Sequence, residues 1–423
     1  MGAESLENMS KNELLRSNII EELFPRKRRM DVNKNWFLMG KKVFKDLLKL
    51  SVAGPKDYTH LDIGNEAIRM TLFGATRRGK TAILRRLMDL AYVNDFHVIF
   101  LTDIKNEMRS SKRPQHQEFR KFMHENDIAQ GLPVKVYRPL FFSTFFNEKL
   151  PEDNEYFSIS SEDMTINEFI GCLGFDKNQT QNQANVVSMY WQNTKNMKEL
   201  EYELEESAEK RSTKDAILRS MRPLNQYKVF TEPSTDFIQD LVDKKVVVFN
   251  VQKFRDIDIK GIPNPIQFYI KIIQRKIVEA KQAGRLKKRV LIIMDEAPVF
   301  LSDPNSLIFK ETKNIVDVQA YLGIYAIFAS QTVNYLKEAS FILNQSRYIM
   351  FPDNFSIDDA KTLLQYIQKY DFHPFWKRDL SLALKAMRSD SRGRVWAVLD
   401  TQKKTVECFR AYMSLSEHMR TKM

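Results

Sequence analysis

The sequence predicts an α/β protein with a mostly parallel sheet and an inserted all-helical subdomain. Short apolar runs, each suited to a buried strand, alternate along the chain with segments of helical pattern. Several of these runs lead directly into polar residues. Because ligands bind at the carboxyl ends of the strands in open parallel sheets, we expect the functional site at that edge.

The composition is that of a basic, globular protein. The chain has 423 residues, of which 43% are hydrophobic, enough for two or three domains and a sizeable core. Lys and Arg number 66 against 54 Asp and Glu, a formal charge of +12. This charge is compatible with a polyanionic partner such as nucleic acid, and solubility alone is the simpler alternative.

The sequence shows no evident targeting or membrane segment. No apolar run reaches the ~18–20 residues of a membrane span, and the N-terminus lacks the pattern of a signal peptide. The two cysteines, Cys172 and Cys408, are too few for a disulfide framework or a zinc site. We therefore expect a cytoplasmic protein without an integral membrane segment.

Two regions are expected in the first part of the chain. Residues 1–64 are basic and helical in pattern, and their densest basic cluster, Phe24–Met30, is either a solvated face or a patch that contacts phosphates. Residues 65–160 begin the α/β core with a strand, a glycine-containing loop and a helix. Two apolar runs, Phe96–Ile104 and Pro133–Leu140, predict further strands.

Two more regions follow. Residues 161–230 are polar and rich in Glu, Lys and Leu, which favours a helical insertion with solvated charged faces. Residues 231–423 return to the α/β pattern, with a strand at Lys244–Gln252 and a long helix at about Pro265–Gly284. Near the end, "RVWAVLD" and "TVECFRAY" flank a short polar turn and predict an antiparallel hairpin at the edge of the sheet.

The stretch "GATRRGKT" at residues 74–81 fits the phosphate-loop pattern G-x-x-x-x-G-K-[ST]. Backbone N–H groups of such a loop, and of the helix after it, surround phosphates. Lys80 would reach the β- and γ-phosphates, and the Thr81 hydroxyl would ligate Mg²⁺. A chance match in a turn is the alternative, but the position between an apolar strand and a helix favours a genuine loop. The predicted nucleotide-binding residues are Gly74, Ala75, Thr76, Arg77, Arg78, Gly79, Lys80, Thr81 and Ala82.

Two arginines make this loop unusual. Arg77 and Arg78 stand where small residues are more common. Arg77 would be strained if its φ must be positive. We expect one or both side chains to project outwards, towards a neighbouring subunit or near the nucleotide.

Acidic residues end another apolar run. "VLIIMDEAP" leads to Asp295 and Glu296 at the end of a predicted strand. Such an Asp can hold Mg²⁺, and the adjacent Glu can orient or deprotonate the attacking water, as in a Walker B motif. The alternative is a helix N-cap at a strand–helix junction.

Two further strand ends carry polar residues. "AIFASQ" ends in Ser330 and Gln331, and this glutamine can hydrogen-bond the γ-phosphate or the attacking water. Without the other motifs, a surface glutamine would be the better interpretation. "LTDIKNEM" places Asp103, Lys105 and Glu107 after another strand, where a role at the same cleft and ordinary loop solvation are equally good explanations.

Taken in order, these motifs resemble those of the HerA/FtsK superfamily of DNA-pumping ATPases. The resemblance runs from about Asn65 to Leu399 and rests on "GATRRGKT", "VIFLTDIKNE", "VLIIMDEAP", "GIYAIFASQT" and "FILNQSRYIMF". It implies a RecA-like P-loop NTPase core in a homo-oligomeric ring, usually a hexamer. ATP and Mg²⁺ would sit between subunits, and double-stranded DNA would pass through the middle.

The sequence also departs from that family. The membrane helices of coupling proteins and the β-barrel of HerA-like translocases have no counterpart, and the stretch before the glutamine-bearing strand has no arginine. Arg347, Arg219 or Arg222 is then the candidate arginine finger, although each is equally explained as a surface or DNA-facing residue. A compact basic chain suits plasmid transfer or viral genome packaging, with an accessory protein as a further partner.

Two other functions compete with a motor on duplex DNA. One is an RNA or single-strand helicase on the same core, and the other is an ATP-dependent assembly switch with little turnover. Glu296 counts against the switch, because a pure binding module does not need a general base. The six scattered histidines and the absence of H-E-x-x-H and G-x-S-x-G patterns leave no other chemistry in competition.

Overall fold

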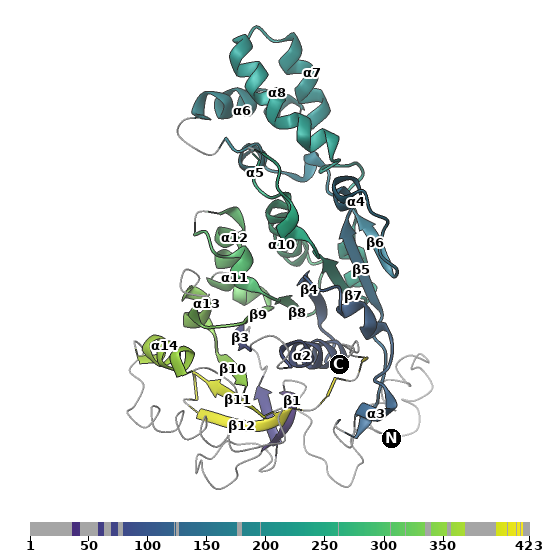
Figure 1. Ribbon diagram of the computed structural model, residues 1–423, viewed down its shortest axis with the longest axis vertical. Coiled ribbons are helices and arrows are strands. Elements are labelled where there is room, and N and C mark those ends of the chain that lie inside the picture. Colours follow the sequence, from purple (N-terminus) through teal and green to yellow (C-terminus); the bar gives the residue numbers. More distant parts are fainter. Residues whose placement is uncertain are drawn as a thin grey trace, which may run out of the picture.

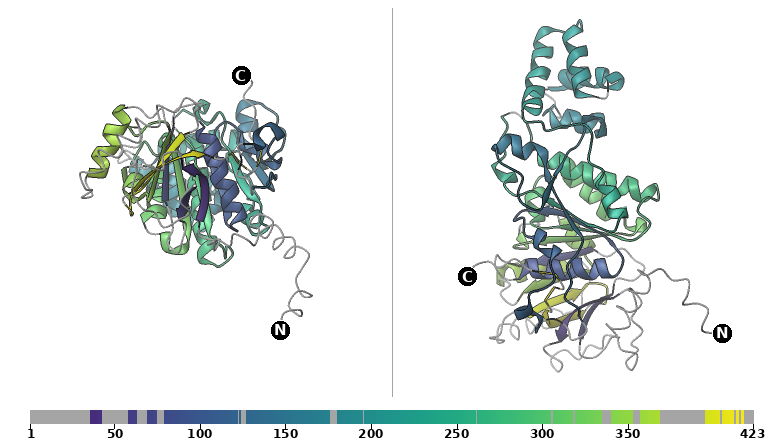
Figure 2. Two further views of the ribbon diagram at one scale, coloured as in Figure 1. Left: turned by 90° about the horizontal axis from the view of Figure 1, so that it is seen from below. Right: turned by 90° about the vertical axis from the view of Figure 1, so that its right-hand side faces the viewer.

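A computed structural model describes the chain as one α/β body with a helical arm at one end (Figure 1). Figure 2 shows the same arm standing away from the sheet. The described residues are 36–42, 58–62, 69–74, 79–121, 123, 127–175, 180–194, 196–260, 262–304, 306–317, 319–334, 340–352, 357–368, 395–403, 405–411, 413–414 and 416–417.

The strands among these residues form one twelve-stranded sheet, ordered β2-β1-β12-β11-β10-β3-β9-β8-β4-β7-β5-β6. Neighbours from β10 to β6 are all parallel. Their bounds are β3 (Arg69–Phe73), β4 (His97–Asp103), β5 (Val134–Pro139), β6 (Asn154–Phe157), β7 (Val246–Asn250), β8 (Val290–Met294), β9 (Ile324–Ser330) and β10 (Tyr348–Pro352). The predicted fold class, an α/β core with a mostly parallel sheet, is confirmed.

Side chains along these strands alternate between the two faces of the sheet, and each face packs into its own apolar core. In β4, Ile99 and Leu101 belong to one buried apolar cluster, whereas Val98 and Phe100 belong to the other. Helix α2 (Lys80–Val93) contributes to the second cluster, and α10 (Pro265–Gln282) contributes to the first. Strands buried on both faces read as continuous apolar runs, which explains why the sequence predicts them well.

At the other end of the sheet, from β10 to β2, neighbouring strands are antiparallel, and their arrangement differs from the prediction. β11 (Val395–Asp400) and β12 (Thr405–Ala411) pair as the predicted hairpin, but β11 also pairs with β10, and β12 with β1. The hairpin is therefore inside the sheet, and its predicted position at the edge is wrong. The edge is formed by β1 (Trp36–Lys42) and β2 (Tyr58–Asp62).

Residues 1–64 were expected to be helical, and this is wrong for β1 and β2. Both are short, and β1 becomes a strand through pairing with β12 from the far end of the chain, which no local pattern reveals. The rest of this region, including the basic cluster Phe24–Met30, lies outside the described residues.

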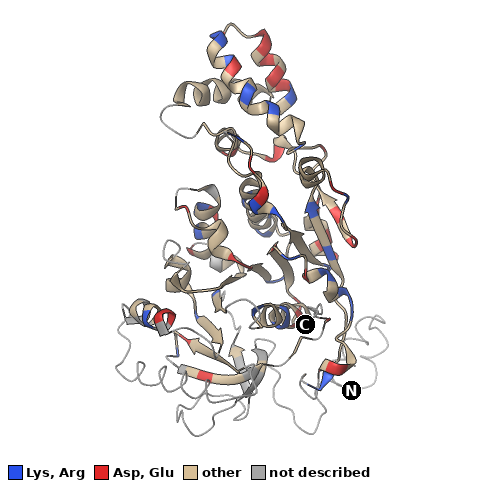
Figure 3. Cartoon of the chain, in the orientation of Figure 1, with Lys and Arg blue, Asp and Glu red and all other residues tan. Residues whose placement is uncertain are grey.

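The arm consists of α6 (Gln181–Thr194), α7 (Met197–Glu206) and α8 (Arg211–Gln226), above α5 (Ile166–Cys172). Acidic side chains gather on α7 and basic ones on α8 (Figure 3). The buried carboxylate of Glu168 in α5 pairs with Lys271 (2.7 Å) and Arg275 (3.2 Å) of α10. This ion cluster attaches the base of the arm to a helix that covers the sheet.

Shorter helices complete the described structure, and none of the described helices is long and apolar enough to cross a membrane. The α-helices are α3 (Gln117–Arg120), α4 (Leu140–Phe146), α9 (Phe237–Val242), α11 (Ala297–Phe300), α12 (Leu307–Asp317), α13 (Ser340–Gln345) and α14 (Ile357–Gln368). The 3-10 helices are η2 (Met108–Lys112), η3 (Ser161–Asp163), η5 (Phe254–Asp256) and η6 (Gln319–Leu322).

Candidate nucleotide site at the carboxyl edge of the parallel strands

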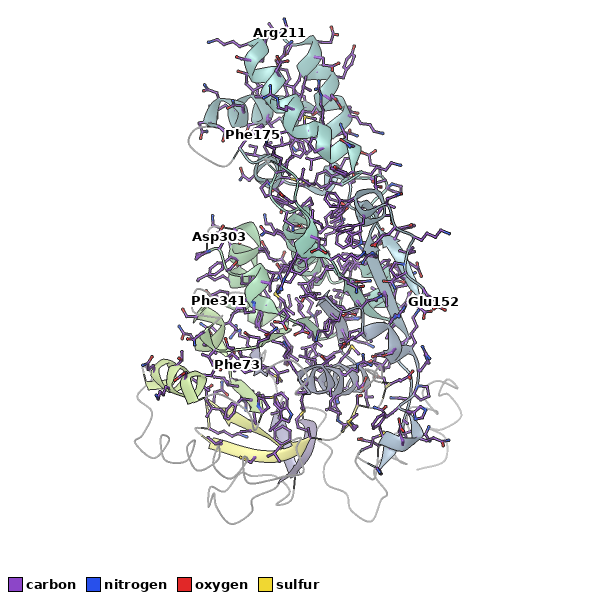
Figure 4. The ribbon with its side chains drawn as sticks, viewed as in Figure 1. Phe73, Glu152, Phe175, Arg211, Asp303 and Phe341 are labelled. Atoms are coloured by element: carbon purple, nitrogen blue, oxygen red, sulfur yellow. The ribbon has the colours of Figure 1, made fainter. Side chains whose placement is uncertain are left out.

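The predicted phosphate loop connects β3 to α2. Phe73, labelled in Figure 4, ends β3, and the N–H of Gly74 donates to the carbonyl of Ser330 at the end of β9 (3.1 Å). Gly79 is the N-cap residue of α2 and has φ 86°, a left-handed conformation that glycine adopts without steric cost. Ala75, Thr76, Arg77 and Arg78 lie outside the described residues, so the expectations for them stay predictions.

The amino end of α2 is suited to an anion. No side chain among the described residues caps this helix, and its first turn holds no acid. The first N–H groups of a helix have no partner within it and carry the positive end of the helix dipole. Thr81 and Ala82 lie half-buried in this turn, directly after Lys80. The turn therefore offers N–H donors and a hydroxyl beside the lysine.

Lys80 is the centre of a buried polar cluster. Its side chain is 6% exposed, and its Nζ lies 2.7 Å from Glu296 Oε1 and 3.1 Å from Asp295 Oδ1. Gln331 Nε2 donates to the same Glu296 oxygen over 3.1 Å. The structure thus brings together Lys80, Asp295, Glu296 and Gln331, which come from three separate motifs.

Strand β8 delivers the two acids to this edge. Glu296 occupies the N-cap position of α11 at φ 50°, but its side chain makes no capping bond. The side chain turns to Lys80 instead, which disfavours the N-cap explanation for this pair. A glutamate in the left-handed region costs of order 1–3 kcal/mol, and such conformations cluster at functional sites.

Asp295 is held from two sides. Its Oδ1 accepts from the N–H of Glu296 (2.9 Å), and its carbonyl accepts from the Thr102 hydroxyl of β4 (2.7 Å). Burial raises the pKa of Asp295, and the nearby Lys80 opposes this shift. Thr102 was not among the predicted site residues, although its hydroxyl between the apolar run "VIFL" and Asp103 was an available signal.

The residues present suit Mg²⁺ beside a phosphate group. Thr81 and Asp295 offer oxygen donors, which this ion prefers. The described residues contain no group of three or more His, Cys, Asp or Glu arranged for a metal. Mg²⁺ is typically bound through one or two protein oxygens, with substrate phosphates and water as the other ligands.

Asp103 has a local structural role. Its buried carboxylate accepts from the N–H groups of Glu107 (3.1 Å) and Met108 (2.9 Å), and so shapes the turn after β4. This matches neither of the two explanations that the sequence suggested for this motif. Lys105 in the same turn is exposed.

Arg347 lies away from the lysine cluster. Its N–H donates to the carbonyl of Arg69 at the amino end of β3 (3.0 Å). Gly74 follows the opposite, carboxyl end of the same strand. Its side chain is 11% exposed, with Nε 3.8 Å from Asp400 Oδ1 and the guanidinium over the ring of Tyr348. An arginine finger at this position stays a prediction without support from the geometry. Arg219 and Arg222, the other candidates, are exposed on α8.

Solved structures share this architecture at low sequence identity. VirB4 of Thermoanaerobacter pseudethanolicus matches with a TM-score of 0.53 and 11% identity, over 89% of this chain and 95% of that chain. The plasmid coupling protein TrwB in complex with ADP and Mg²⁺ matches with a TM-score of 0.50 and 12% identity, over 92% and 96%. No family model matches the sequence, and no curated protein matches it.

The chain has the fold of the RecA-like P-loop NTPases. This confirms, at the level of the fold, the resemblance to HerA/FtsK-type ATPases that the motifs predict. The genome packaging NTPase B204 from Sulfolobus turreted icosahedral virus 2 also matches, with 10% identity over 82% of this chain and 98% of that chain. Its TM-score of 0.35 is too low to support an inference.

Proposed function

We propose that this protein is an ATP-hydrolysing motor that translocates double-stranded DNA through a homo-oligomeric ring. The observation that carries the proposal is the convergence of Lys80, Asp295, Glu296 and Gln331 at the carboxyl edge of the parallel strands. The fold shared with VirB4 and with TrwB, a plasmid coupling protein solved with ADP and Mg²⁺, supports it.

Lys80 and the first turn of α2 form the phosphate-binding part of this proposal. The ammonium group of Lys80 and the N–H groups after Gly79 bind the phosphates of ATP. Thr81 and Asp295 would hold Mg²⁺, which neutralises phosphate charge when it is bound. Thr102 keeps Asp295 in place through its hydrogen bond to the Asp295 carbonyl.

Glu296 is the proposed general base. In the structure its carboxylate shares one oxygen between Lys80 and Gln331. When phosphate takes over Lys80, the carboxylate is released from its ammonium partner and can accept a proton from the attacking water. Gln331 stays beside Glu296 and orients the attacking water. Because Gln331 follows β9, this contact links the end of that strand to the state of the nucleotide.

The oligomer and the DNA are the less direct part of the proposal. A hexameric ring with ATP between subunits follows from the family resemblance, as does a setting in mobile-element DNA transfer or viral genome packaging. The formal charge of +12 suits a partner held by its phosphate backbone. Backbone contacts are independent of sequence, which a motor needs.

The test compares ATP hydrolysis with duplex DNA, single-stranded nucleic acid and no nucleic acid. Stimulation by duplex DNA supports the motor, stimulation only by single strands indicates the helicase, and no stimulation with slow turnover indicates the assembly switch. Lys80→Ala and Glu296→Gln variants serve as controls for the site. If both hydrolyse ATP like the parent, the site assignment fails. Electron micrographs without closed rings in the presence of ATP and DNA would contradict the ring.

A further inference from the structure

One buried aromatic side chain lies against both ends of the phosphate loop. A Cβ atom placed on Gly74 would lie 3.4 Å from Cη2 of Trp396, and one placed on Gly79 would lie 4.0 Å from its Nε1. Cη2 and Nε1 belong to the two different rings of the indole. A single rigid plane therefore spans the gap between the first and the last glycine of the loop.

The surroundings of Trp396 hold this plane in place. Trp396 lies on β11, opposite Pro352 of β10 on one side and Phe409 of β12 on the other. Its side chain is 2% exposed and belongs to the same buried cluster as Ile83 of α2. It is thus enclosed by the C-terminal hairpin and by the face of the sheet that α2 covers.

These contacts differ from those of an ordinary core tryptophan. Trp191 in the arm is equally buried, but its ring stacks on the side chain of Phe169 with 4.0 Å between ring centroids. Trp396 instead lies beside Gly74 at the end of β3 and Gly79 before α2, which place no side chain of their own between backbone and indole. Movement of the ring would shift Gly79 and the first turn of α2 relative to β3, and with them the N–H groups that this turn offers to a phosphate.

We propose that Trp396 is a positioning residue of the nucleotide site, and that its indole holds Gly74 and Gly79, and with them the first turn of α2, in the arrangement that binds phosphate. The C-terminal hairpin is then part of the nucleotide site. This inference rests on the proposed nucleotide binding, but it does not depend on DNA translocation.

The first experiment uses the fluorescence of Trp396. Trp36, Trp191 and Trp376 are changed to Phe in the full chain, which leaves Trp396 as the sole tryptophan. Titration with ADP and Mg²⁺ is expected to change the emission, with a midpoint within about 3-fold of the Kd that calorimetry gives for the parent. The response is expected to vanish with the additional change Lys80→Ala. Calorimetric binding of ADP without any change in emission overturns the proposal.

The second experiment separates positioning from stability. We expect Trp396→Leu to raise the Kd for ADP about 10-fold or more, and Trp396→Phe, which keeps a flat ring, to raise it less than about 3-fold. Trp191→Leu is the matched control, since it removes a buried indole from the arm and should leave the Kd unchanged. ADP affinity of Trp396→Leu equal to that of the parent, or a loss equal to that of Trp191→Leu, refutes the role.

The two proposals fail in different ways. If the parent binds ADP but duplex DNA does not stimulate hydrolysis, the proposal of a DNA motor is wrong. The experiments on Trp396 then still decide whether Trp396 positions the nucleotide site. If the parent binds no nucleotide by calorimetry, both proposals are wrong.

Discussion

Helix α2 carries two sets of buried charges, and they are built differently. At its first residue, Lys80 meets the side chains of Asp295 and Glu296. Further along, Arg85, Arg86 and Asp89 are fully buried as well. The two sets lie on one helix and experience similar burial, so the difference between them lies in their partners.

In the second set, the charged side chains bind mostly to main-chain groups, and Arg86 also pairs with the carboxylate of Asp127. Arg85 donates to the carbonyls of Glu107 (2.6 Å) and Glu417, and to the Ser110 hydroxyl (2.7 Å). Asp89 accepts from the hydroxyl (2.8 Å) and the N–H (3.2 Å) of Ser416. These bonds attach Ser416 and Glu417, near the C-terminus, to the helix.

Arg86 shows the same pattern. Its two terminal nitrogens lie 2.7 and 3.3 Å from the carboxylate oxygens of Asp127, and it also donates to the carbonyl of Met413 (3.4 Å). A buried charge is costly unless it is paired and hydrogen-bonded, and here the partners are fixed parts of the fold.

The lysine cluster differs because its partners are side chains, which the proposed function would exchange for a phosphate. Two acids share one ammonium group, and one of them sits on a left-handed backbone. A phosphate group offers the same lysine an equivalent partner. The comparison teaches that burial of a charge does not mark function by itself. What distinguishes the proposed site is that the side chains of Lys80, Asp295, Glu296 and Gln331 converge on one another from separate elements.

The largest expected effect is on activity at the lysine cluster. Glu296→Gln removes the proposed base but keeps the shape of the side chain and an oxygen that can accept from Lys80. We expect kcat for ATP to fall roughly 100-fold or more, while the free energy of unfolding changes by less than ~1 kcal/mol. Steady-state hydrolysis and urea unfolding measure the two quantities. A variant with parental kcat would remove Glu296 from the catalytic residues.

The next effect is on stability at the second set. Arg85→Met leaves the carbonyl of Glu107 and the hydroxyl of Ser110 without their cationic donor, and we expect a loss of about 3–5 kcal/mol in unfolding free energy. Nucleotide affinity of the folded fraction should stay within about 3-fold of the parent. Arg219→Met on the exposed face of α8 is the matched control and should cost less than ~0.5 kcal/mol. Equal urea midpoints for the two variants would contradict the comparison.

A third effect is a change in the pH dependence of stability. Burial raises the pKa of Asp103 from 3.8 to about 6. Between these values the folded protein holds a proton that the unfolded chain releases, so this residue makes stability fall as pH rises from about 4 to 6, and contributes no slope above that.

Asp103→Asn should remove this contribution, which is roughly 2–3 kcal/mol across the window. The measurement is urea unfolding of parent and variant at a series of pH values from 4 to 7. Parallel curves of unfolding free energy against pH for the two proteins would show that Asp103 titrates normally.

The smallest effect is expected at the C-terminal attachment. Ser416→Ala removes the hydroxyl that donates to Asp89 but leaves the N–H bond, and we expect a loss of about 1–2 kcal/mol in unfolding free energy. ATP hydrolysis at saturating substrate should be unchanged. Ser212→Ala on the exposed side of α8 is the control, and a difference between the two variants below ~0.3 kcal/mol would argue against the attachment.

Much of the core was predictable from the sequence because its signals are local. Strands buried on both faces, such as β4 and β8, produce apolar runs, and the order of these runs predicts a mostly parallel sheet. The hairpin near the C-terminus was found from its alternation, but its place inside the sheet was not. β1 comes from residues far away in the sequence, and pairing between distant strands leaves no local trace.

The sequence by itself determined the phosphate-loop pattern, the acids after β8 and the glutamine after β9, because each requires particular residues at a fixed local spacing. Only the tertiary structure decided that Lys80, Glu296 and Gln331 share hydrogen bonds, that Arg85 and Arg86 are buried, and that Trp396 lies beside Gly74 and Gly79. The physical reason is that a sequence pattern indicates which side chains are buried. The partners of those side chains depend on which distant strands and segments fold next to them.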